Sequence, residues 1–202
     1  DLFQTELQGL MATVGQKVSL GVEPGHGVRV LDVLNGFDQA ATGRWMLPNL
    51  IVGMPISVVL RLSVPPRGRA SELVGLRLAW DEPRRPGRQE LRTLLSLPTM
   101  PRARWESLPA DPAVQEHVAL LMAARAKQEA ARALQRGDMG TTVAMLAKSR
   151  HLASSIMASA ETEKELEDIS AIEASLQRGD VGAFNKLAKF QSWLRGRGRS
   201  SS

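Results

Sequence analysis

The residues that could bind a metal ion lie too far apart in this sequence to act together. The three histidines are His26, His117 and His151, and none has a second histidine or a carboxylate pair at ligand spacing. We expect His26 in a glycine-flanked turn and the other two on helices. We therefore interpret all three as surface or half-buried side chains and predict no metal-binding residue.

An acidic run offers the only close group of carboxylates that could serve in metal binding or acid–base catalysis. Its members are Glu161, Glu163, Glu165, Glu167 and Asp168. Carboxylates are favoured in the first turn of a helix, because that end carries a partial positive charge. We interpret the run as the solvated first turn of a helix.

No motif for nucleophilic catalysis or phosphate binding is apparent. The segment GHGVRV at 25–30 mimics the start of a dinucleotide-binding loop, but it lacks the third glycine and leads into a strand where a helix is required. The chain has no Cys, which excludes disulfides and thiol chemistry. A hydrolase would need a nucleophile beside a base, and we identify no such pair. We predict that the protein is not an enzyme and has no catalytic residue and no cofactor.

The whole chain has a net charge of +5 and a pI of about 10.2. Arginine-rich segments dominate the positive charge of its first half. Such charge could follow the phosphates of a nucleic acid, with binding that weakens steeply as salt rises. The residues that would carry it are Arg84, Arg85, Arg88 and Arg92, with the basic tail. We treat a nucleic-acid-binding accessory domain as the alternative function and a soluble surface with arginine-rich loops as the simpler interpretation.

The heptapeptides LQRGDMG, at 134–140, and LQRGDVG, at 176–182, are nearly identical. Arg-Gly-Asp is an adhesion tag in some cell-surface proteins, but that use requires a flexible protruding loop. We instead interpret each copy as the end of one helix and the start of the next. Gly137 suits the left-handed conformation that follows a helix, and Asp138 can accept hydrogen bonds from the free N–H groups of the following helix.

Residues 16–98 have the pattern of an antiparallel β-sandwich. Apolar residues recur at every second position in short segments separated by turn residues. The predicted strands cover 17–22, 28–34, 45–47, 56–64, 72–80 and 88–97. The last segment is rich in leucine and would also suit a helix. These are fewer strands than a usual sandwich has, so we predict that an apolar edge, in ISVVLRLSV or ELVGLRLAW, pairs with another copy or with neighbouring polypeptide.

Residues 111–195 are predicted to form a four-helix bundle made of two similar helix-turn-helix units. Asp111 is a good N-cap for the first helix because Pro112 follows it. Thr162 and Glu165 have capping-box spacing at the start of the third helix. The apolar stripes contain Val114, Val118, Leu121, Met122 and Leu134, then Val143, Leu146 and Ile156, then Leu166, Ile169, Ile172 and Leu176, and finally Val181, Phe184, Leu187 and Leu194.

The two ends of the chain have their own character. Residues 1–15 have the pattern of an amphipathic helix that Gly15 ends, and residues 196–202 are polar and glycine-rich, which predicts a disordered tail. The first residue is Asp1, so we interpret the sequence as a piece of a longer protein and leave an upstream signal peptide open. No run approaches 18 apolar residues. We expect no membrane span and a cytoplasmic location.

Two phrases carry a family resemblance. DLFQTELQGLMATVGQKVSLGVEPGHGVRVLDVLN, followed by GRWMLPNLIVGMPISVVLRLSV, resembles the segment downstream of a von Willebrand factor A domain in bacterial stand-alone proteins of that class. In that pattern the last helix of the A domain, here 1–15, leads into a small β-sandwich and then a helical C-terminal region. The metal-binding Asp-x-Ser-x-Ser loop of A domains does not occur in this sequence, so no site residue is carried over.

The resemblance implies a non-enzymatic binding protein, and some members of this class work beside MoxR-type ATPases. Together with the residue patterns, it predicts an α+β fold in which an antiparallel β-sandwich precedes a helical bundle of paired helices. The predicted function is a non-catalytic protein-interaction module, the accessory part of a von Willebrand factor A domain protein, with protein partners.

Overall fold

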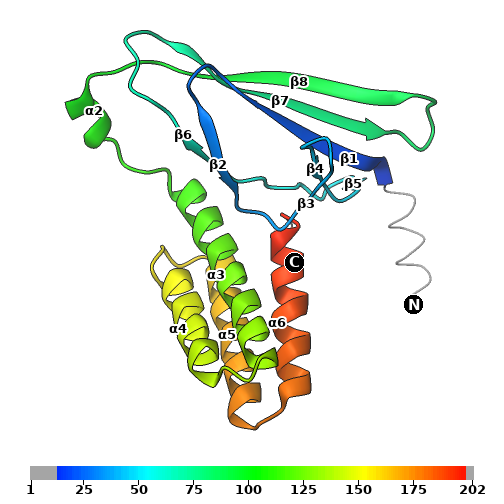
Figure 1. Ribbon diagram of the computed structural model, residues 1–202, viewed down its shortest axis with the longest axis vertical. Coiled ribbons are helices and arrows are strands. Elements are labelled where there is room, and N and C mark those ends of the chain that lie inside the picture. Colours follow the sequence, from blue (N-terminus) through cyan, green and yellow to red (C-terminus); the bar gives the residue numbers. More distant parts are fainter. Residues whose placement is uncertain (1–12, 199–202) are drawn as a thin grey trace. The chain divides into compact units, whose positions relative to one another are not determined.

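The computed structural model describes residues 13–198, which divide into two compact units (Figure 1). The β unit comprises 13–33, 37–56 and 60–108, and the helical unit comprises 34–36, 57–59 and 109–198. Two short segments from the first third of the chain therefore belong with the helices. The protein is α+β, with antiparallel sheets and a separate set of helices, as the sequence predicts.

The β unit contains a six-stranded sheet and a two-stranded sheet. The larger sheet has the order β3-β4-β1-β7-β8, with β5 also paired to β1, and the smaller sheet pairs β2 with β6. The strands are β1 Thr13–Pro24, β2 Arg29–Val33, β3 Asp38–Gln39, β4 Trp45–Met46, β5 Leu50–Ile51, β6 Leu60–Ser63, β7 Ser71–Asp81 and β8 Arg88–Leu97.

Strands β1, β7 and β8 form the framework of the larger sheet. Leu78 of β7 lies opposite Leu20 of β1 on one side and opposite Leu91 of β8 on the other. Because residues that lie opposite share a face of the sheet, the leucines of β8 continue the apolar face of β7. An irregularity between Glu72 and Val74 interrupts β7, whereas β8 runs on without one. The strand prediction for 88–97 is confirmed, and its helical alternative is wrong.

The two sheets meet through a small apolar cluster. Val28 precedes β2, and it packs with Leu73 and Val74 of β7. Val22, Leu62 and Leu76 pack around this group and are partly buried. The cluster lies towards one end of β7, so the smaller sheet shields only part of the apolar face of the larger one.

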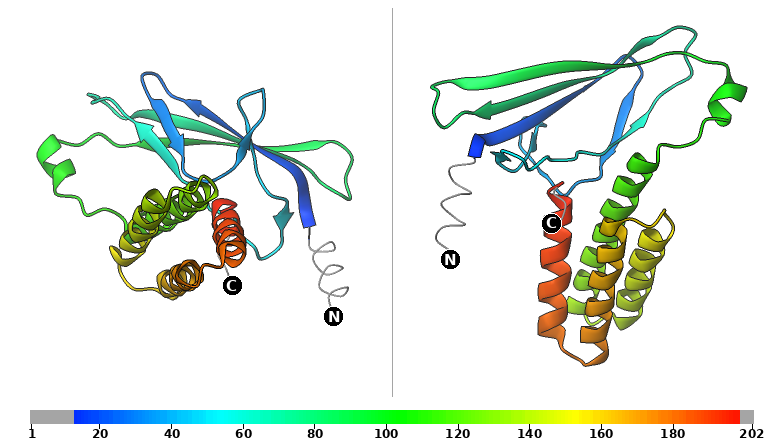
Figure 2. Two further views of the ribbon diagram at one scale, coloured as in Figure 1. Left: turned by 60° about the horizontal axis from the view of Figure 1, so that its bottom comes forward. Right: turned by 180° about the vertical axis from the view of Figure 1, so that it is seen from behind.

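In the helical unit, each long helix packs against neighbours in sequence, and α3 also packs against α6 (Figure 2, left). The helices are α3 Pro112–Gln135, α4 Met139–Ser154, α5 Ala160–Gln177 and α6 Val181–Gly196. The buried core consists of Ala130, Ala131, Leu146, Ile172, Phe184 and Ala188. The alanines let the helix axes approach closely, so the Ala-rich middle of α3 forms its buried face.

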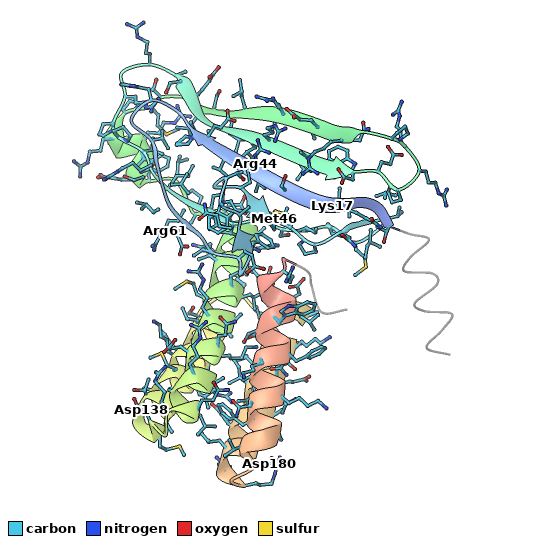
Figure 3. The ribbon with its side chains drawn as sticks, turned by 45° about the vertical axis from the view of Figure 1, so that its right-hand side comes forward. Lys17, Arg44, Met46, Arg61, Asp138 and Asp180 are labelled. Atoms are coloured by element: carbon cyan, nitrogen blue, oxygen red, sulfur yellow. The ribbon has the colours of Figure 1, made fainter. Side chains whose placement is uncertain are left out.

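The helix boundaries at the repeated heptapeptides follow the prediction. Gly137 and Gly179 have φ of 76° and 69°, and Asp138 and Asp180 each accept a side-chain hydrogen bond from a backbone N–H in the first turn of the next helix. Figure 3 shows both aspartates at the same end of the helical unit. Asp111 caps α3 in the same way.

Several local predictions are wrong. Residues 13–15, predicted as the end of a helix, are the start of β1, whereas 1–12 lie outside the described residues. Gly15 does not end a helix. A Cβ at this position would lie 2.8 Å from Trp80 Cδ1, so the absence of a side chain leaves room for Trp80. The capping box of α5 uses Ser159 with Thr162, not Thr162 with Glu165.

The predicted apolar stripes are wrong at a few helix starts and ends. Val114, Val143 and Val181 are exposed, because each lies in the first turns of its helix, outside the core. Ile156 follows the end of α4. A further short helix, α2 Arg102–Glu106, interrupts the proline-rich stretch in the β unit.

The last described residues are ordered, contrary to the predicted tail. Gly196 ends α6, and Gly198 donates to Arg195 O at 2.9 Å. Residues 199–202 lie outside the described part of the chain. Within that part, no helix combines the length and apolar character that crossing a membrane requires.

Candidate functional site

Strand β8 forms an open edge of the larger sheet. It pairs with β7 on one side, and no strand of the described residues pairs with its other side. Nearly every residue of β8 is exposed, including Leu91 at 58% and Leu94 at 60%. Alternate N–H and C=O groups of an edge strand point away from the sheet, so β8 presents both apolar side chains and backbone hydrogen-bonding groups.

Three of the four exposed leucines of β8 lie on one face of the sheet, and Leu94 lies on the other. Leu91 lies opposite Leu78, and Leu95 lies opposite Val74. Leu97, in the same alternation, is also exposed. On this face of the sheet, Val74 is buried and Leu78 is partly buried, whereas the leucines of β8 are exposed. We call the exposed leucines of β8 the β8 leucine edge: Leu91, Leu94, Leu95 and Leu97.

The opposite face of β8 carries charges that are paired within the same sheet. Arg88 donates to Asp81 at 2.9 Å, and Arg92 donates to Glu90 at 2.5 Å. Arg77 of β7 also donates to Glu90. The two guanidinium groups, Arg77 first and Arg92 second, lower the pKa of Glu90 to about 2. Glu90 is thus shared by Arg77 and Arg92, and Asp81 by Arg88 and Lys17, so each carboxylate offsets part of the charge of its two cationic neighbours.

These ion pairs also bear on the arginines considered for nucleic-acid binding. Arg88 and Arg92 are occupied by carboxylates, and Arg88 further donates to Ser19 Oγ at 2.8 Å. Arg84 and Arg85 are exposed in the loop between β7 and β8. Two of the four arginines are therefore engaged by carboxylates of the sheet, and the nucleic-acid alternative stays a prediction.

A buried ionic cluster lies inside the helical unit. Lys127 Nζ of α3 is 2.6 Å from Glu165 Oε1 of α5, and the two side chains are 0% and 2% exposed. Arg195 of α6 donates to Glu161 at 2.5 Å and lies 3.9 Å from Glu165. The cluster joins α3, α5 and α6 through balanced charges.

The cluster corrects the interpretation of the acidic run. Glu161 and Glu165 are four residues apart on one helix, so they share a face, and on that face Glu165 is buried whereas the Glu161 side chain is 40% exposed. Glu163 and Glu167 are exposed, as the solvated interpretation requires. Burial raises the pKa of Asp168, with Lys127 opposing the shift. The sequence signal for the cluster was the spacing of the carboxylates together with Lys127 on an otherwise Ala-rich helix.

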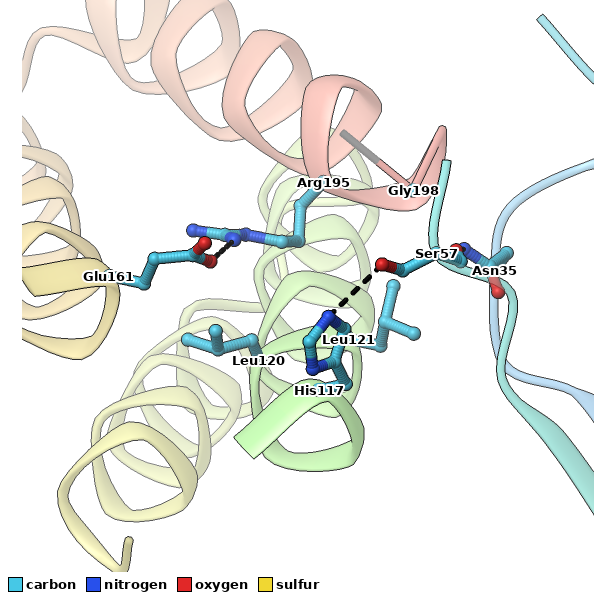
Figure 4. Close-up of a pocket in the computed structure, with 8 residues that line it drawn as sticks. All are labelled: Asn35, Ser57, His117, Leu120, Leu121, Glu161, Arg195 and Gly198. Atoms are coloured by element: carbon cyan, nitrogen blue, oxygen red, sulfur yellow. Dashed lines mark hydrogen bonds and ion pairs between the residues drawn. The ribbon is translucent and has the colours of Figure 1, made fainter. Parts of the chain in front are cut away.

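A shallow pocket lies beside this cluster, within the helical unit (Figure 4). His117 Nε2 is 3.1 Å from Ser57 Oγ, and its Nδ1 is 2.8 Å from Ala113 O. Nδ1–H donates to the Ala113 carbonyl, and Nε2 is hydrogen-bonded to the Ser57 hydroxyl. Asn35, Glu161 and Arg195 complete the polar lining.

The Ser57–His117 pair has the elements of a nucleophile and a base, but its surroundings favour a structural role. The pocket has a volume of about 20 Å³, which is room for roughly one water molecule. The side chain of Asn35 is already engaged, since it donates to Ser57 O and accepts from Val59 N, both at 2.9 Å. The pair holds the 57–59 segment against α3.

The other two histidines occupy places that the sequence indicates. His26 lies in a turn, where its carbonyl accepts from Arg67, and His151 is exposed on α4. Among residues 13–198, no group of His, Cys, Asp or Glu side chains is arranged to hold a metal ion.

No protein-family model matches the chain, and no curated protein matches it significantly. Among solved structures, the chain is similar to the ArnB paralog VWA2 from Sulfolobus acidocaldarius, with a TM-score of 0.55 and 13% sequence identity. The similarity covers 89% of this chain and 43% of that chain, so the chain corresponds to less than half of that protein. The likeness shows that this fold occurs within a VWA-type protein.

Proposed function

We propose that this chain is a non-catalytic protein-interaction module, the accessory part of a von Willebrand factor A domain protein, and that it binds polypeptide by strand addition at β8. The observation that carries the proposal is the β8 leucine edge, which combines exposed apolar side chains with a strand edge that no described strand pairs. The fold likeness to VWA2 supports the assignment to this kind of protein.

Strand addition uses two features that β8 offers together. Backbone hydrogen bonds along an edge supply affinity, and alternate side chains supply selectivity. An added strand on β8 would place its own apolar residues beside Leu91 and Leu95, where they extend the covered face of β7. We propose a protein partner with an extended apolar segment. The family resemblance suggests a MoxR-type ATPase as the first candidate to test.

The decisive experiment places a photo-crosslinking amino acid at Thr93, in the middle of β8, and at Val52, which is also exposed in the β unit. We expect crosslinks to another polypeptide from position 93 but not from position 52. The crosslinked protein, or a purified MoxR-type ATPase, should then bind the purified chain.

The variant Leu91→Glu should weaken that binding at least tenfold, because it places a charge in the apolar contact. The matched control is Leu31→Glu, since Leu31 is 52% exposed and lies on β2, outside β8. Equal weakening by both variants, or crosslinking that does not depend on position, would show that β8 is not the binding edge.

A further inference from the structure

We infer that a second copy of this chain is a polypeptide that β8 binds, and that the two β8 strands pair antiparallel about a twofold axis through Thr93. The inference rests on the proposed strand addition at β8 and names its occupant. It follows from the pattern of β8, RQELRTLLSL, and from the lengths of the other edges in the β unit.

When two β8 strands pair antiparallel about a twofold axis through Thr93, side chains that suit one another lie opposite across the pair. Leu91 of one copy then lies opposite Leu95 of the other, and Thr93 lies opposite itself. Gln89 faces Leu97, and Glu90 faces Ser96. Leucine pairs and threonine pairs across strands are stabilising, and like charges directly opposite are destabilising. This register places leucine opposite leucine and threonine opposite threonine, and it places no like charges directly opposite one another.

The charged residue nearest the axis is Arg92, and its surroundings permit the pairing. It would lie opposite Leu94 of the second copy and diagonal to that copy's Arg92. Each Arg92 shares its Glu90, at 2.5 Å, with Arg77, so a carboxylate lies beside each guanidinium group and offsets part of its charge where the two copies meet. Edge strands usually prevent such contacts with charged side chains, proline or a bulge. β8 contains neither a proline nor a bulge, and its charged residues are Arg88, Glu90 and Arg92.

The lengths of the other edges favour β8 as its own partner. The far edge of the larger sheet is β3, Asp38–Gln39, and the smaller sheet consists of β2, Arg29–Val33, and β6, Leu60–Ser63. None of these can match Arg88–Leu97 along its length. Among the described strands, only a second β8 supplies an open edge of equal length, and an identical edge on both copies forms a closed twofold dimer.

The absence of Cys from the chain makes a direct test possible, because any introduced cysteine is unique. Thr93→Cys should form a disulfide-linked dimer under mild oxidation, since directly opposite residues have their Cβ atoms about 4.5–5.5 Å apart. Gln89→Cys and Leu97→Cys should each remain unlinked alone but should link to one another when mixed. Val52→Cys serves as the control for random collisions.

Sedimentation of the cysteine-free chain measures the same contact without crosslinking. We expect a dimer that dissociates on dilution, with Leu91→Glu raising the dissociation constant at least tenfold and Leu31→Glu leaving it unchanged. Circular dichroism of both variants checks that they remain folded. A chain that is monomeric at every concentration, or a dimer indifferent to Leu91→Glu, overturns the inference. If Leu91→Cys forms a disulfide-linked dimer and Thr93→Cys does not, the proposed register about Thr93 is wrong.

The outcomes for the dimer and for the proposed function are separable. A monomeric chain whose position 93 still crosslinks to a different polypeptide would remove the second copy as occupant and leave strand addition standing. A dimer without any heterologous crosslink would support the inference and show self-association as the use of the edge.

Discussion

Charged side chains are accommodated inside the helical unit because each has an opposite charge within reach. Lys127 lies against Glu165, and Arg195 lies against Glu161. Removing charges from water is expensive, so such a pair contributes little net stability while it is intact. Removing only Lys127 is costly, because the buried Glu165 then keeps only the longer contact to Arg195, at 3.9 Å.

We therefore predict that Lys127→Met lowers the free energy of unfolding by about 3–5 kcal/mol. Adding Glu165→Leu should restore most of the loss, because no unpaired buried charge remains. Urea denaturation of the two variants measures both changes. Lys148→Met is the control, since Lys148 is exposed on α4, and it should have almost no effect. A double variant no more stable than Lys127→Met would contradict the account.

Asp168 provides a pH-dependent prediction. Burial raises its pKa above the ordinary value of 3.8, with Lys127 lowering it and Glu165 raising it. A carboxyl group whose pKa is raised by folding stabilises the fold while protonated, and that contribution is lost as the pH rises through the folded pKa.

Asp168→Asn should therefore stabilise the protein near neutral pH relative to the natural chain, and the advantage should shrink below pH 3.8. Thermal unfolding of the natural chain and the variant, near neutral pH and below pH 3.8, measures the difference in stability. Glu167→Gln, one residue away and exposed, should show no such trend. An advantage of equal size at both pH values would mean that the ionisation of Asp168 does not matter.

At the scale of elements, the repeated heptapeptide sets where helices end. Gly179 has a φ of 69°, and no atom lies within 4 Å of the place where a Cβ would be. A substitution there is consequently strained by backbone conformation alone, without a steric clash. Asp180 then begins α6 by accepting from Ala183 N at 2.8 Å.

Gly179→Val should lower the free energy of unfolding by about 1 kcal/mol or more, because a β-branched residue tolerates positive φ poorly. Gly182→Ala is the control in the first turn of α6, where the added Cβ would meet Asp180 Oδ1 at an ordinary 3.5 Å. An unchanged melting temperature in Gly179→Val would refute the role of this glycine as a helix stop.

Sequence periodicity predicted most strands and helices, because the alternation of a strand and the spacing of a helix depend on residues close together in the sequence. It did not predict which side chains meet across long distances. Lys127 and Glu165 lie on different helices, and the inward turn of the acidic run depends on that packing. The open β8 edge was also missed as such: the apolar-edge prediction named 56–64 and 72–80, whereas β7 is an interior strand and β6 is short.

At the scale of the whole molecule, the helical unit depends on segments that come from the β region of the sequence. Asn35 is 3% exposed and joins 34–36 to 57–59 through its bonds to Ser57 O and Val59 N. Arg125 of α3 donates to Leu34 O at 2.9 Å. These bonds satisfy buried backbone groups that would otherwise lose their partners.

Asn35→Ala should destabilise the protein by about 1–3 kcal/mol, because it leaves the Val59 N–H without its acceptor. The change is measured by denaturant unfolding, with Gln39→Ala as the control, since the Gln39 side chain makes only an exposed bond to Gly43 O. Similar stability of the two variants would show that the 34–36 segment is not needed to hold 57–59.

The backbone bonds at the end of α6 have a consequence for biosynthesis. Gly36 N donates to Gly196 O at 3.0 Å, and Ser57 N donates to Gly198 O at 2.9 Å. Ribosomes add about 5–20 residues per second, so the early donors wait on the order of ten seconds or more for these acceptors. During that interval Gly36 N and Ser57 N are without these acceptors, and the helical unit is unfinished. These two hydrogen bonds between the early segments and the end of α6 are therefore among the last to form on a newly made chain.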